Sequence, residues 1–486
     1  MIKNDHSLYA AYKAKDARFD GRFFIGISTT GIYCRPVCRA RQAKMENCTF
    51  YHTAAEAEKA GYRPCLLCRP ELAPGNAVTD AIATLARRAA RMLEDHAASS
   101  QNLDELAGQL GCTGRHLRRV FMAEYHVSPV FYRQTCRLLL AKNLLTDTNL
   151  SILDVAMTAG FGSLRRFNDL FKRQYALSPT ALRKQIPLPQ KPDGVITLAL
   201  GYRSPYRFDA MLRFLDGRAI PGVEVVRDGS YRRTVRLTDA KGTPIHGWLR
   251  VGHQPAKHVL TITMSHALLP ALSHVLARIR HLFDLCCDPA TIDQTLASMN
   301  EIRPGLWVLG TRVPGSFDPF ETAVRAVLGQ QITVKAARTL AARITAAYGM
   351  PLQTGLDGLT HLFPSPADLL ALGEPLENHL GPLGIPAARA RTICELAKAF
   401  ANWQIHFDAG AQPEVEIKKL LALPGIGNWT AQYIAMRTMG WPDAFLETDA
   451  GIAKALAPHT PKERLKMAEA WRPWRSYATV NLWSTL

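Results

Sequence analysis

Two closely spaced pairs of cysteines near the start of the chain constrain its folding more than any other sequence feature. Three residues separate Cys34 from Cys38, and two separate Cys65 from Cys68. Each pair can place two thiols on one tetrahedral metal ion, and the residues between the pairs can fold back to bring all four together. The spacing therefore predicts a small module built around one Zn²⁺. A purely structural zinc is an open alternative, because most four-thiolate sites only stabilise a fold.

The charge of the chain indicates a polyanionic partner. The sequence has 59 Lys and Arg against 41 Asp and Glu, a formal net charge of +18 over 486 residues. Nucleic acid is the commonest such partner, and a solvated basic surface is the alternative. Hydrophobic residues make up 47% of the chain, which excludes global disorder. No apolar run resembles a signal peptide or membrane span, so we expect a cytoplasmic protein with no membrane partner.

Changes in residue pattern divide the chain into segments. Helical periodicity begins near residue 79, and the Pro-rich stretch IPLPQKPDG at 186–194 reads as a linker. Beyond it, VITLAL and HVLTITM alternate as strands do, and helical patterns return near residue 301. We expect a multidomain α+β protein with a small zinc α+β module (1–78), an all-α double helix-turn-helix module (79–186), an α+β segment (187–300) and a helical bundle carrying a helix-hairpin-helix (301–486).

Two stretches of the second segment have a helix-turn-helix pattern. NLDELAGQLGCTGRHLRRVF has an apolar face made by Leu103, Leu106, Ala107 and Leu110. Its second helix carries basic residues, and the later stretch at 151–172 echoes this arrangement. The side chains that we expect to contact DNA are Arg115, Arg118, Arg119, Arg165 and Arg166. Many folds of this kind bind protein instead, which is the alternative. In the later stretch, the helical spacing of Phe161, Phe167 and Phe171 is typical of a core.

The residues around the four cysteines resemble a known family. FFIGISTTGIYCRPVCRARQAKMENCTFYHTAAEAEKAGYRPCLLCRPELAP is similar, over its whole length, to the N-terminal domain of Ada-type DNA alkylation response proteins. The resemblance implies that Cys34, the cysteine after Gly-Ile-Tyr, accepts a methyl group from a DNA methylphosphotriester, while the other three cysteines only hold zinc. Zinc keeps the sulfurs as thiolates, which are the nucleophilic form. The thioether product makes this reaction stoichiometric.

The basic residues beside this site are expected to contact the DNA backbone, and they are Arg35, Arg39, Arg41 and Lys44. The alternative is that they only form a generic basic surface. Cys48 lies outside the metal-binding spacing and is expected to be buried or to have no role in the site.

The later helix-turn-helix stretch also resembles a known family. The signature of AraC-type regulators, notably Gly-Phe-x-Ser and the Ser178-Pro179 step, is similar to SILDVAMTAGFGSLRRFNDLFKRQYALSPTALRK. That resemblance implies promoter DNA, and RNA polymerase, as partners.

The stretch LLALPGIGNWTAQYIAMRTMGWPDAFLETDAGIAKAL at 420–456 indicates the function of the last segment. Its Leu-Pro-Gly-Ile-Gly is typical of a helix-hairpin-helix loop, in which Gly425 and Gly427 let backbone N–H groups approach a DNA phosphate. Such a hairpin alone only binds DNA non-specifically. Followed by Asp449, it resembles the helix-hairpin-helix base-excision glycosylases, and the resemblance makes Asp449 the catalytic carboxylate. The alternative is that Asp449 only caps the helix starting at Ala450.

Residues 195–486 resemble the AlkA type, 3-methyladenine DNA glycosylase II, in ITLALGYRSPYRFDAMLRFL, FETAVRAVLGQQITV and WRPWRSYATVNLW. The resemblance implies a pocket in which a flipped alkylpurine, made cationic by methylation, stacks on aromatic rings. Its expected lining is Trp429, Tyr433, Trp483 and Phe214, for which core packing is the alternative. Gln331 stands where the AlkA pattern has a Leu wedge, and we expect it to fill the duplex there.

Two subclasses of glycosylase are excluded. Trp429 occupies the position where bifunctional lyases carry Lys, and Cys394 is the single cysteine after residue 300, so neither a Schiff base nor an iron–sulfur cluster is expected. No Pro-Cys-His-Arg motif occurs, so we expect no repair of O6-methylguanine. The combined expectation is an Ada-like sensor and regulator fused to a monofunctional alkylbase glycosylase. Two alternatives are a damage-responsive transcription factor whose glycosylase half only binds DNA, and a zinc-stabilised DNA-binding protein without methyl transfer.

Overall fold

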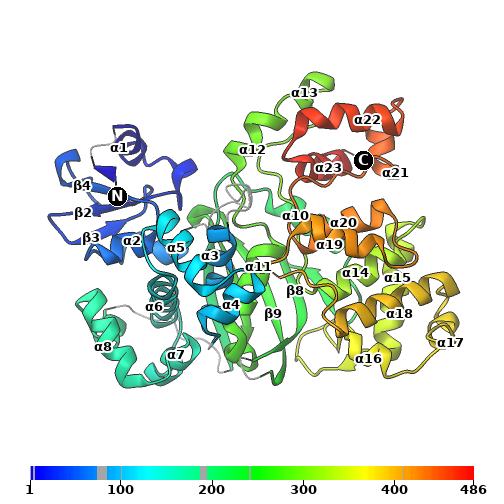
Figure 1. Cartoon of the computed structure of the whole chain (residues 1–486), viewed down its shortest axis with the longest axis horizontal. Helices are drawn as coiled ribbons and strands as arrows, with labels where there is room; N and C mark the ends of the chain where they lie inside the picture. The colour runs from blue at the N-terminus through cyan, green and yellow to red at the C-terminus, as the bar shows by residue number, and fades with distance from the viewer. Residues whose placement is uncertain are drawn as a thin grey trace.

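The structure is a computed structural model that describes residues 2–3, 6–73, 85–99, 101–185, 194–239, 242–408 and 410–485. Its parts follow one another along the longest axis of the molecule (Figure 1). The N-terminal module and the helix-turn-helix helices lie at one end, a sheet lies in the middle, and the C-terminal helices lie at the other end. The expected linker at 186–194 lies, except for Gly194, outside the described residues.

A five-stranded sheet in the order β1-β4-β2-β3-β5 forms the N-terminal module. Its strands pair antiparallel except for β3 and β5, which are parallel. Ile25 of the central strand lies opposite both Phe50 and Cys34, so the first cysteine stands at the end of a strand that is paired on both sides. The elements are β1 (Ile2–Lys3), α1 (His6–Lys13), β2 (Phe24–Ile27), β3 (Ile32–Cys34), β4 (Cys48–Tyr51), α2 (Ala54–Lys59) and β5 (Arg63–Pro64).

The second module is helical, as expected. It comprises α3 (Leu85–Asp95), α4 (Leu103–Gln109), α5 (Gly114–Tyr125), α6 (Pro129–Asp147), α7 (Ile152–Thr158), α8 (Leu164–Tyr175) and α9 (Pro179–Lys184). Six of these helices begin at a side chain that accepts a hydrogen bond from the backbone three residues on, namely Asn102, Thr113, Ser128, Ser151, Ser163 and Ser178. The helix pairs α4–α5 and α7–α8 are the two predicted units, and α6 joins them.

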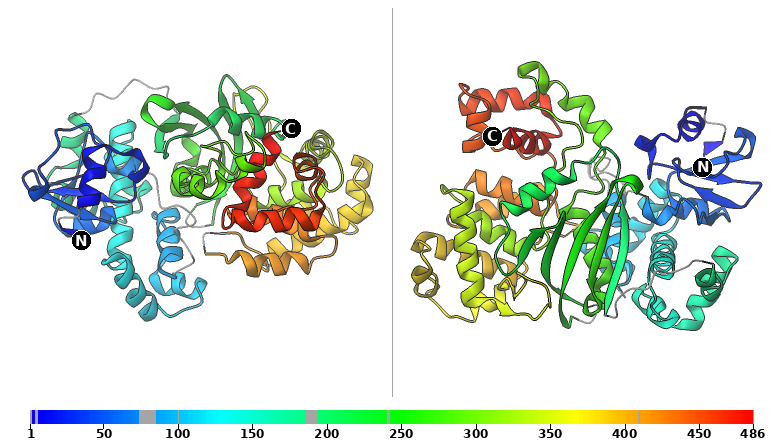
Figure 2. Two further views of the ribbon diagram at one scale, coloured as in Figure 1. Left: turned by 90° about the horizontal axis from the view of Figure 1, so that it is seen from above. Right: turned by 180° about the vertical axis from the view of Figure 1, so that it is seen from behind.

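A second five-stranded sheet, antiparallel in the order β6-β10-β9-β8-β7, follows in the middle of the molecule, as Figure 2 shows from behind. The predicted strands VITLAL and HVLTITM are β6 and β10. Buried Ile196, Leu198 and Leu200 of β6 belong to one hydrophobic core with residues of α6 to α9. The elements are β6 (Val195–Gly201), α10 (Phe208–Asp216), β7 (Glu224–Arg227), β8 (Ser230–Thr238), β9 (Pro244–Gln254), β10 (Val259–Ser265) and α11 (Leu272–Leu282).

The C-terminal part has two hydrophobic cores, one around Val324 and Ile434 and the other around Trp471 and Leu482. Tyr433 of α20 packs against both, so α20 lies at their boundary. The elements are α12 (Pro289–Leu296), α13 (Met299–Ile302), α14 (Pro319–Leu328), α15 (Val334–Tyr348), β11 (Met350–Pro351), β12 (His361–Leu362), α16 (Pro366–Leu370), α17 (Glu377–Leu380), α18 (Ala387–Ala401), α19 (Pro413–Leu421), α20 (Asn428–Thr438), α21 (Ala450–Ala455), α22 (Pro461–Ala468) and α23 (Arg475–Ser484).

Among the described helices, none combines the length and the apolar composition that crossing a membrane requires.

Candidate functional sites

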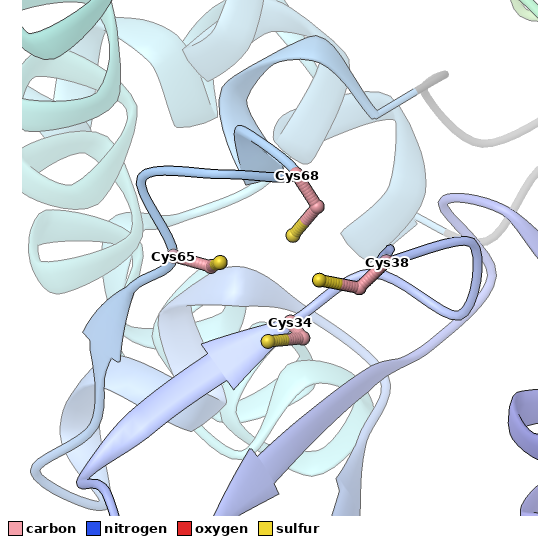
Figure 3. Close-up of side chains that lie close together, drawn as sticks. All are labelled: Cys34, Cys38, Cys65 and Cys68. Atoms are coloured by element: carbon pink, nitrogen blue, oxygen red, sulfur yellow. The ribbon is translucent and has the colours of Figure 1, made fainter. Parts of the chain in front are cut away.

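The sulfurs of Cys34, Cys38, Cys65 and Cys68 point towards a common centre (Figure 3). All four lie within 4.8 Å of one another. Zn–S bonds of about 2.3 Å in a tetrahedron separate the sulfurs by roughly 3.8 Å, so the cluster fits Zn²⁺ with little adjustment. Three of the cysteines are buried and Cys68 is partly exposed. Zn²⁺ is therefore the cofactor of this module, as the spacing predicts.

A backbone amide distinguishes one of the four sulfurs. The Arg35 N–H, next to Cys34 in the chain, donates to Cys68 Sγ at 3.3 Å. Because such donation withdraws electron density from a thiolate, it makes Cys68 Sγ a weaker nucleophile than the same thiolate without that bond.

The basic residues beside the cluster have different environments. Arg35 donates from Nε to Asp20 Oδ1 at 2.8 Å, makes a second bond to the same carboxylate, and donates from Nη1 to the Cys68 carbonyl at 3.1 Å. Its guanidinium thus holds the loop after Cys34 from inside the protein. The other three predicted DNA contacts are exposed, namely Arg39, Arg41 and Lys44. Cys48 is buried and lies outside the cluster.

The strand that ends at Cys34 is tied to the helix-turn-helix module. The Tyr33 hydroxyl donates to Glu58 Oε1 at 3.0 Å, and the Thr135 hydroxyl of α6 donates to Glu58 Oε2 at 3.2 Å. Burial raises the pKa of Glu58 to about 8, although these hydrogen bonds act in the opposite direction. Lys142 of α6 forms a buried ion pair with Glu71 at 2.6 Å. The zinc module and α6 therefore share a well-defined polar interface.

The predicted DNA-contacting arginines of both helix-turn-helix units are exposed on their second helices. They are Arg115, Arg118 and Arg119 on α5, and Arg165 and Arg166 on α8. The residues assigned to the core of these units are buried, with Phe167 and Phe171 fully inaccessible to solvent. The geometry leaves the basic faces free to meet a polyanion.

The hairpin between α19 and α20 requires glycine at one position. Gly425 has a φ of +84°, and a Cβ there would lie 2.0 Å from the Thr392 hydroxyl oxygen. Gly427 is exposed and precedes the first residue of α20. An unpredicted residue, Gln330, donates from Nε2 to the Gly425 carbonyl at 2.9 Å. The next residue, Gln331, is exposed with a φ of +53°, so it projects from the turn before α15.

The four predicted pocket aromatics lie together, although they come from α10, α20 and α23. The rings of Trp429 and Tyr433 stack with centroids 5.2 Å apart and planes 9° apart. Phe214 and Trp483 are nearly parallel, with centroids 6.3 Å apart and planes 24° apart, and Tyr433 lies 6.3 Å from Trp483. All four side chains are only partly buried. They therefore form a partly exposed aromatic cluster at the edge of the core.

Asp449 stands beside this pocket. Its Oδ1 accepts hydrogen bonds from Gly451 N at 2.9 Å, Ile452 N at 3.1 Å and Trp483 Nε1 at 2.8 Å. Its Oδ2 accepts from Trp429 Nε1 at 3.1 Å. The carboxylate therefore caps α21, as the alternative interpretation holds, and two indoles of the pocket also fix it in place. Capping and a role in the pocket are compatible in this geometry.

Sequence reasoning missed two arginines of the pocket. Arg437 Nη1 donates to the Tyr433 hydroxyl at 2.6 Å, and the Arg218 guanidinium lies 3.7 Å from the Phe214 ring centroid. Both follow an aromatic residue by one helical turn, Arg437 after Tyr433 and Arg218 after Phe214. That spacing is a signal that could have placed them on the same side as the aromatics.

Comparison with protein families gives four matches along the chain. Residues 7–71 match the metal binding domain of Ada, residues 106–185 a helix-turn-helix domain, residues 197–318 the AlkA N-terminal domain, and residues 324–474 the HhH-GPD superfamily base excision DNA repair proteins. Together with the four-cysteine cluster and the hairpin, these matches define a zinc-containing DNA-binding protein that carries a DNA glycosylase domain.

Relatives identify the family. The chain is 39% identical, over 98% of its length and 96% of the relative, to the probable bifunctional transcriptional activator/DNA repair enzyme AlkA of Mycobacterium tuberculosis. DNA-3-methyladenine glycosylase 2 of Escherichia coli is 36% identical over 59% of this chain and 96% of its own. The bifunctional transcriptional activator/DNA repair enzyme Ada of Escherichia coli is 36% identical over 32% of this chain and 43% of its own. The chain belongs to the family of bifunctional Ada/AlkA-type transcriptional activators and DNA repair enzymes.

Proposed function

We propose that this protein excises alkylated purines such as 3-methyladenine from DNA and that it also transfers methyl groups from DNA methylphosphotriesters to Cys34. The observation that carries the first activity is the position of Asp449, which two indole N–H groups of the aromatic pocket hold at 2.8 and 3.1 Å. A flipped base entering the pocket would bring its sugar towards this carboxylate. The pocket thus holds the base and the carboxylate lies near the sugar, the two groups that the scissile N-glycosidic bond joins.

Asp449 acts on the sugar. Breaking the N-glycosidic bond builds positive, oxocarbenium-like charge on the sugar, which a fixed carboxylate stabilises. Three of the four N–H groups that donate to Asp449 converge on Oδ1, and one donates to Oδ2. Oδ2 therefore keeps an acceptor site, through which the carboxylate can also orient or deprotonate the attacking water.

The hairpin and the neighbouring turn hold the duplex. Exposed backbone around Gly425 and Gly427 binds a phosphate next to the lesion through N–H groups. Gln331 enters the space that the flipped nucleotide leaves and forms hydrogen bonds with the orphaned base. Gln330 keeps this turn in register with the hairpin by its bond to the Gly425 carbonyl.

At the zinc site, the Cys34 thiolate attacks the methyl carbon of a methylphosphotriester. The new S–C bond forms as the C–O bond breaks, and the oxygen leaves with the electron pair as an ordinary phosphodiester. With Zn²⁺ bound, the four thiolates would carry a net charge of −2, and methylation of Cys34 would leave −1. With a phosphate about 8 Å away and an effective dielectric of ~40, this relieves roughly 1 kcal/mol per phosphate. Two or three phosphates would raise DNA affinity by about one to two orders of magnitude.

The methylated protein then binds promoter sites through α5 and α8 and activates transcription with RNA polymerase. The exposed arginines of these helices support this proposal. We also propose that the chain consists of four domains, with boundaries after residues 78, 186 and 300. The segments 74–84 and 186–193 lie outside the described residues.

The direct test is single-turnover release of 3-methyladenine from methylated duplex DNA by the purified full chain. Release that is first order in bound duplex supports the proposal. Tight binding of the same duplex without any base release would instead support a transcription factor whose C-terminal half only binds DNA.

A further inference from the structure

Two guanidinium groups stand against the base pocket, and neither has an ion-pair partner among the described residues. The Arg218 Cζ lies 3.7 Å from the centroid of Phe214. The Arg437 Cζ lies 4.9 Å from the same centroid and 5.5 Å from that of Tyr433. By contrast, the nearby Arg325 is neutralised by Glu224 and Glu321 at 2.9 and 3.0 Å. Two uncompensated positive charges therefore face two of the four pocket rings.

Arg437 is a fixed part of this wall. Its Nε and Nη2 donate to the carbonyls of Pro314 and Gly315, at 2.5 and 3.0 Å, and its Nη1 donates to the Tyr433 hydroxyl. Its side chain is buried. Arg218 is less constrained, because it is only partly buried and its Nη1 reaches the Phe214 carbonyl at 3.4 Å. Arg218 is therefore the residue whose charge can be changed with the smaller loss of hydrogen bonds, one to a carbonyl against the three that Arg437 donates.

The two guanidiniums lie outside the space in which a base would stack. Phe214 and Trp483 are near-parallel at 6.3 Å, and a planar base between two rings needs roughly 7 Å, two contacts of about 3.5 Å. A small opening of this gap would admit a base. Among the described residues, no guanidinium lies within the roughly 6 Å of Trp483 or Trp429 that a cation–π contact requires. Arg218 therefore covers Phe214 from the side away from Trp483.

The field of these arginines reaches the pocket interior. Burial alone would raise the pKa of Tyr433, yet the charges of Arg437, Arg218 and Arg325 lower it. A methylated purine in the pocket would bring a further positive charge to the other face of Phe214. Two unit charges about 8 Å apart at an effective dielectric of ~30 repel by an amount that corresponds to roughly tenfold in binding. A neutral base does not meet this repulsion, and its carbonyl oxygens can accept hydrogen bonds.

We propose that Arg218 is a specificity-determining residue that weakens the preference of the pocket for positively charged bases relative to neutral damaged bases. The proposal rests on the proposed glycosylase function. Cationic alkylpurines are already good leaving groups and need little help from the pocket. Neutral bases leave poorly, so a pocket that does not favour cations lets one site act on both classes.

The test compares two bases in the same duplex, 7-methylguanine, which is cationic as a nucleotide, and hypoxanthine, which is neutral. Single-turnover excision rates are measured for Arg218→Gln and Arg218→Met, which remove the charge, and for Arg218→Lys, which keeps it. Each rate is divided by the parental rate on the same base, so that the different intrinsic lability of the two N-glycosidic bonds cancels. We expect both charge-free variants to raise the ratio of 7-methylguanine to hypoxanthine excision about tenfold, and the Lys variant to leave it unchanged.

A binding measurement separates this proposal from the proposed function. The same two bases attached to 2′-fluoro-2′-deoxyribose, which resists cleavage, report selectivity without catalysis. A tenfold shift in relative affinity in the charge-free variants supports the role of Arg218, even if the protein releases no base. An unchanged ratio in folded Gln and Met variants, by binding and by rate, would overturn it, and so would an equal shift in the Lys variant.

Discussion

Replacing Asp449 by Asn removes one negative charge from the pocket while keeping nearly the same shape. A carboxylate about 4 Å from a developing positive charge, at an effective dielectric of ~20, contributes roughly 4 kcal/mol. That energy corresponds to about a thousandfold in rate. We therefore expect the Asp449→Asn variant to release 3-methyladenine at least a hundredfold more slowly than the parent.

The hydrogen bonds around Asp449 also predict a change in stability. The Asn oxygen can still accept from the backbone of Gly451 and Ile452 and keep α21 capped. Its amide nitrogen then faces the indole N–H of Trp429, which donates to Oδ2 at 3.1 Å in the parent. Two N–H donors would then face each other, and losing this hydrogen bond lowers the free energy of unfolding by about 1–2 kcal/mol. We therefore expect a lower melting temperature together with the lost activity.

A double variant separates the two effects. Adding Trp429→Phe to Asp449→Asn removes the opposed donor, so the melting temperature should recover part of its loss. The rate of base release should not recover, because the charge is still absent. The assay is single-turnover release of 3-methyladenine, with duplex binding and melting measured on the same samples. Base release by Asp449→Asn within tenfold of the parent would refute the catalytic role and leave Asp449 as a helix cap.

Three further predictions concern the zinc site, the wedge and the interface between the first two modules. The full chain should bind one zinc, and Cys65→Ser should lose it and destabilise the N-terminal module while base release persists. Gln331→Ala should weaken binding to a duplex with an abasic-site mimic, by an amount that depends on the opposing base. Glu58→Gln should abolish a pH dependence of stability. The native pKa of Glu58, about 8, exceeds its ordinary 4.5, so the parent loses stability as pH rises between these values.

Each of these predictions has a result that contradicts it. A folded, metal-free parent chain would end the zinc assignment, and metal analysis with thermal melting decides it. Equal binding by Gln331→Ala and the parent across all four opposing bases would place the wedge elsewhere. In denaturant titrations from pH 5 to 8, the free energy of unfolding of Glu58→Gln should exceed that of the parent by roughly 2–4 kcal/mol at the alkaline end. Parallel curves for the two proteins would mean that Glu58 is not held protonated in the native state.

Features set by short-range spacing could be predicted from the sequence. The four cysteines, the strands β6 and β10 and the helix pairs of the second module all depend on local patterns, and the structure has them where expected. The aromatic pocket could be assembled only through a family resemblance. Its rings come from residues 214, 429, 433 and 483, and no local pattern joins segments so far apart.

Contacts between distant side chains were beyond sequence reasoning. Arg35 stands in a basic stretch and reads as a DNA contact, but its guanidinium pairs with Asp20. The Asp20 carbonyl in turn accepts a bond at 2.9 Å from Arg203, a buried residue just after β6. Arg22 likewise forms an ion pair with Asp288, at the start of α12. A charged residue gives the same signal in a sequence whether it faces solvent or a buried partner, so these ties between modules become visible only in the fold.

We propose above that one chain performs two different reactions on alkylated DNA. The most direct measurement follows the label from DNA methylated with a ¹⁴C-methyl donor after incubation with the purified, zinc-loaded protein. We expect two labelled products: free 3-methyladenine in solution, and a peptide that contains S-methylated Cys34, at no more than one methyl per chain. Label confined to the DNA, or label on the protein at a residue other than Cys34, would contradict it.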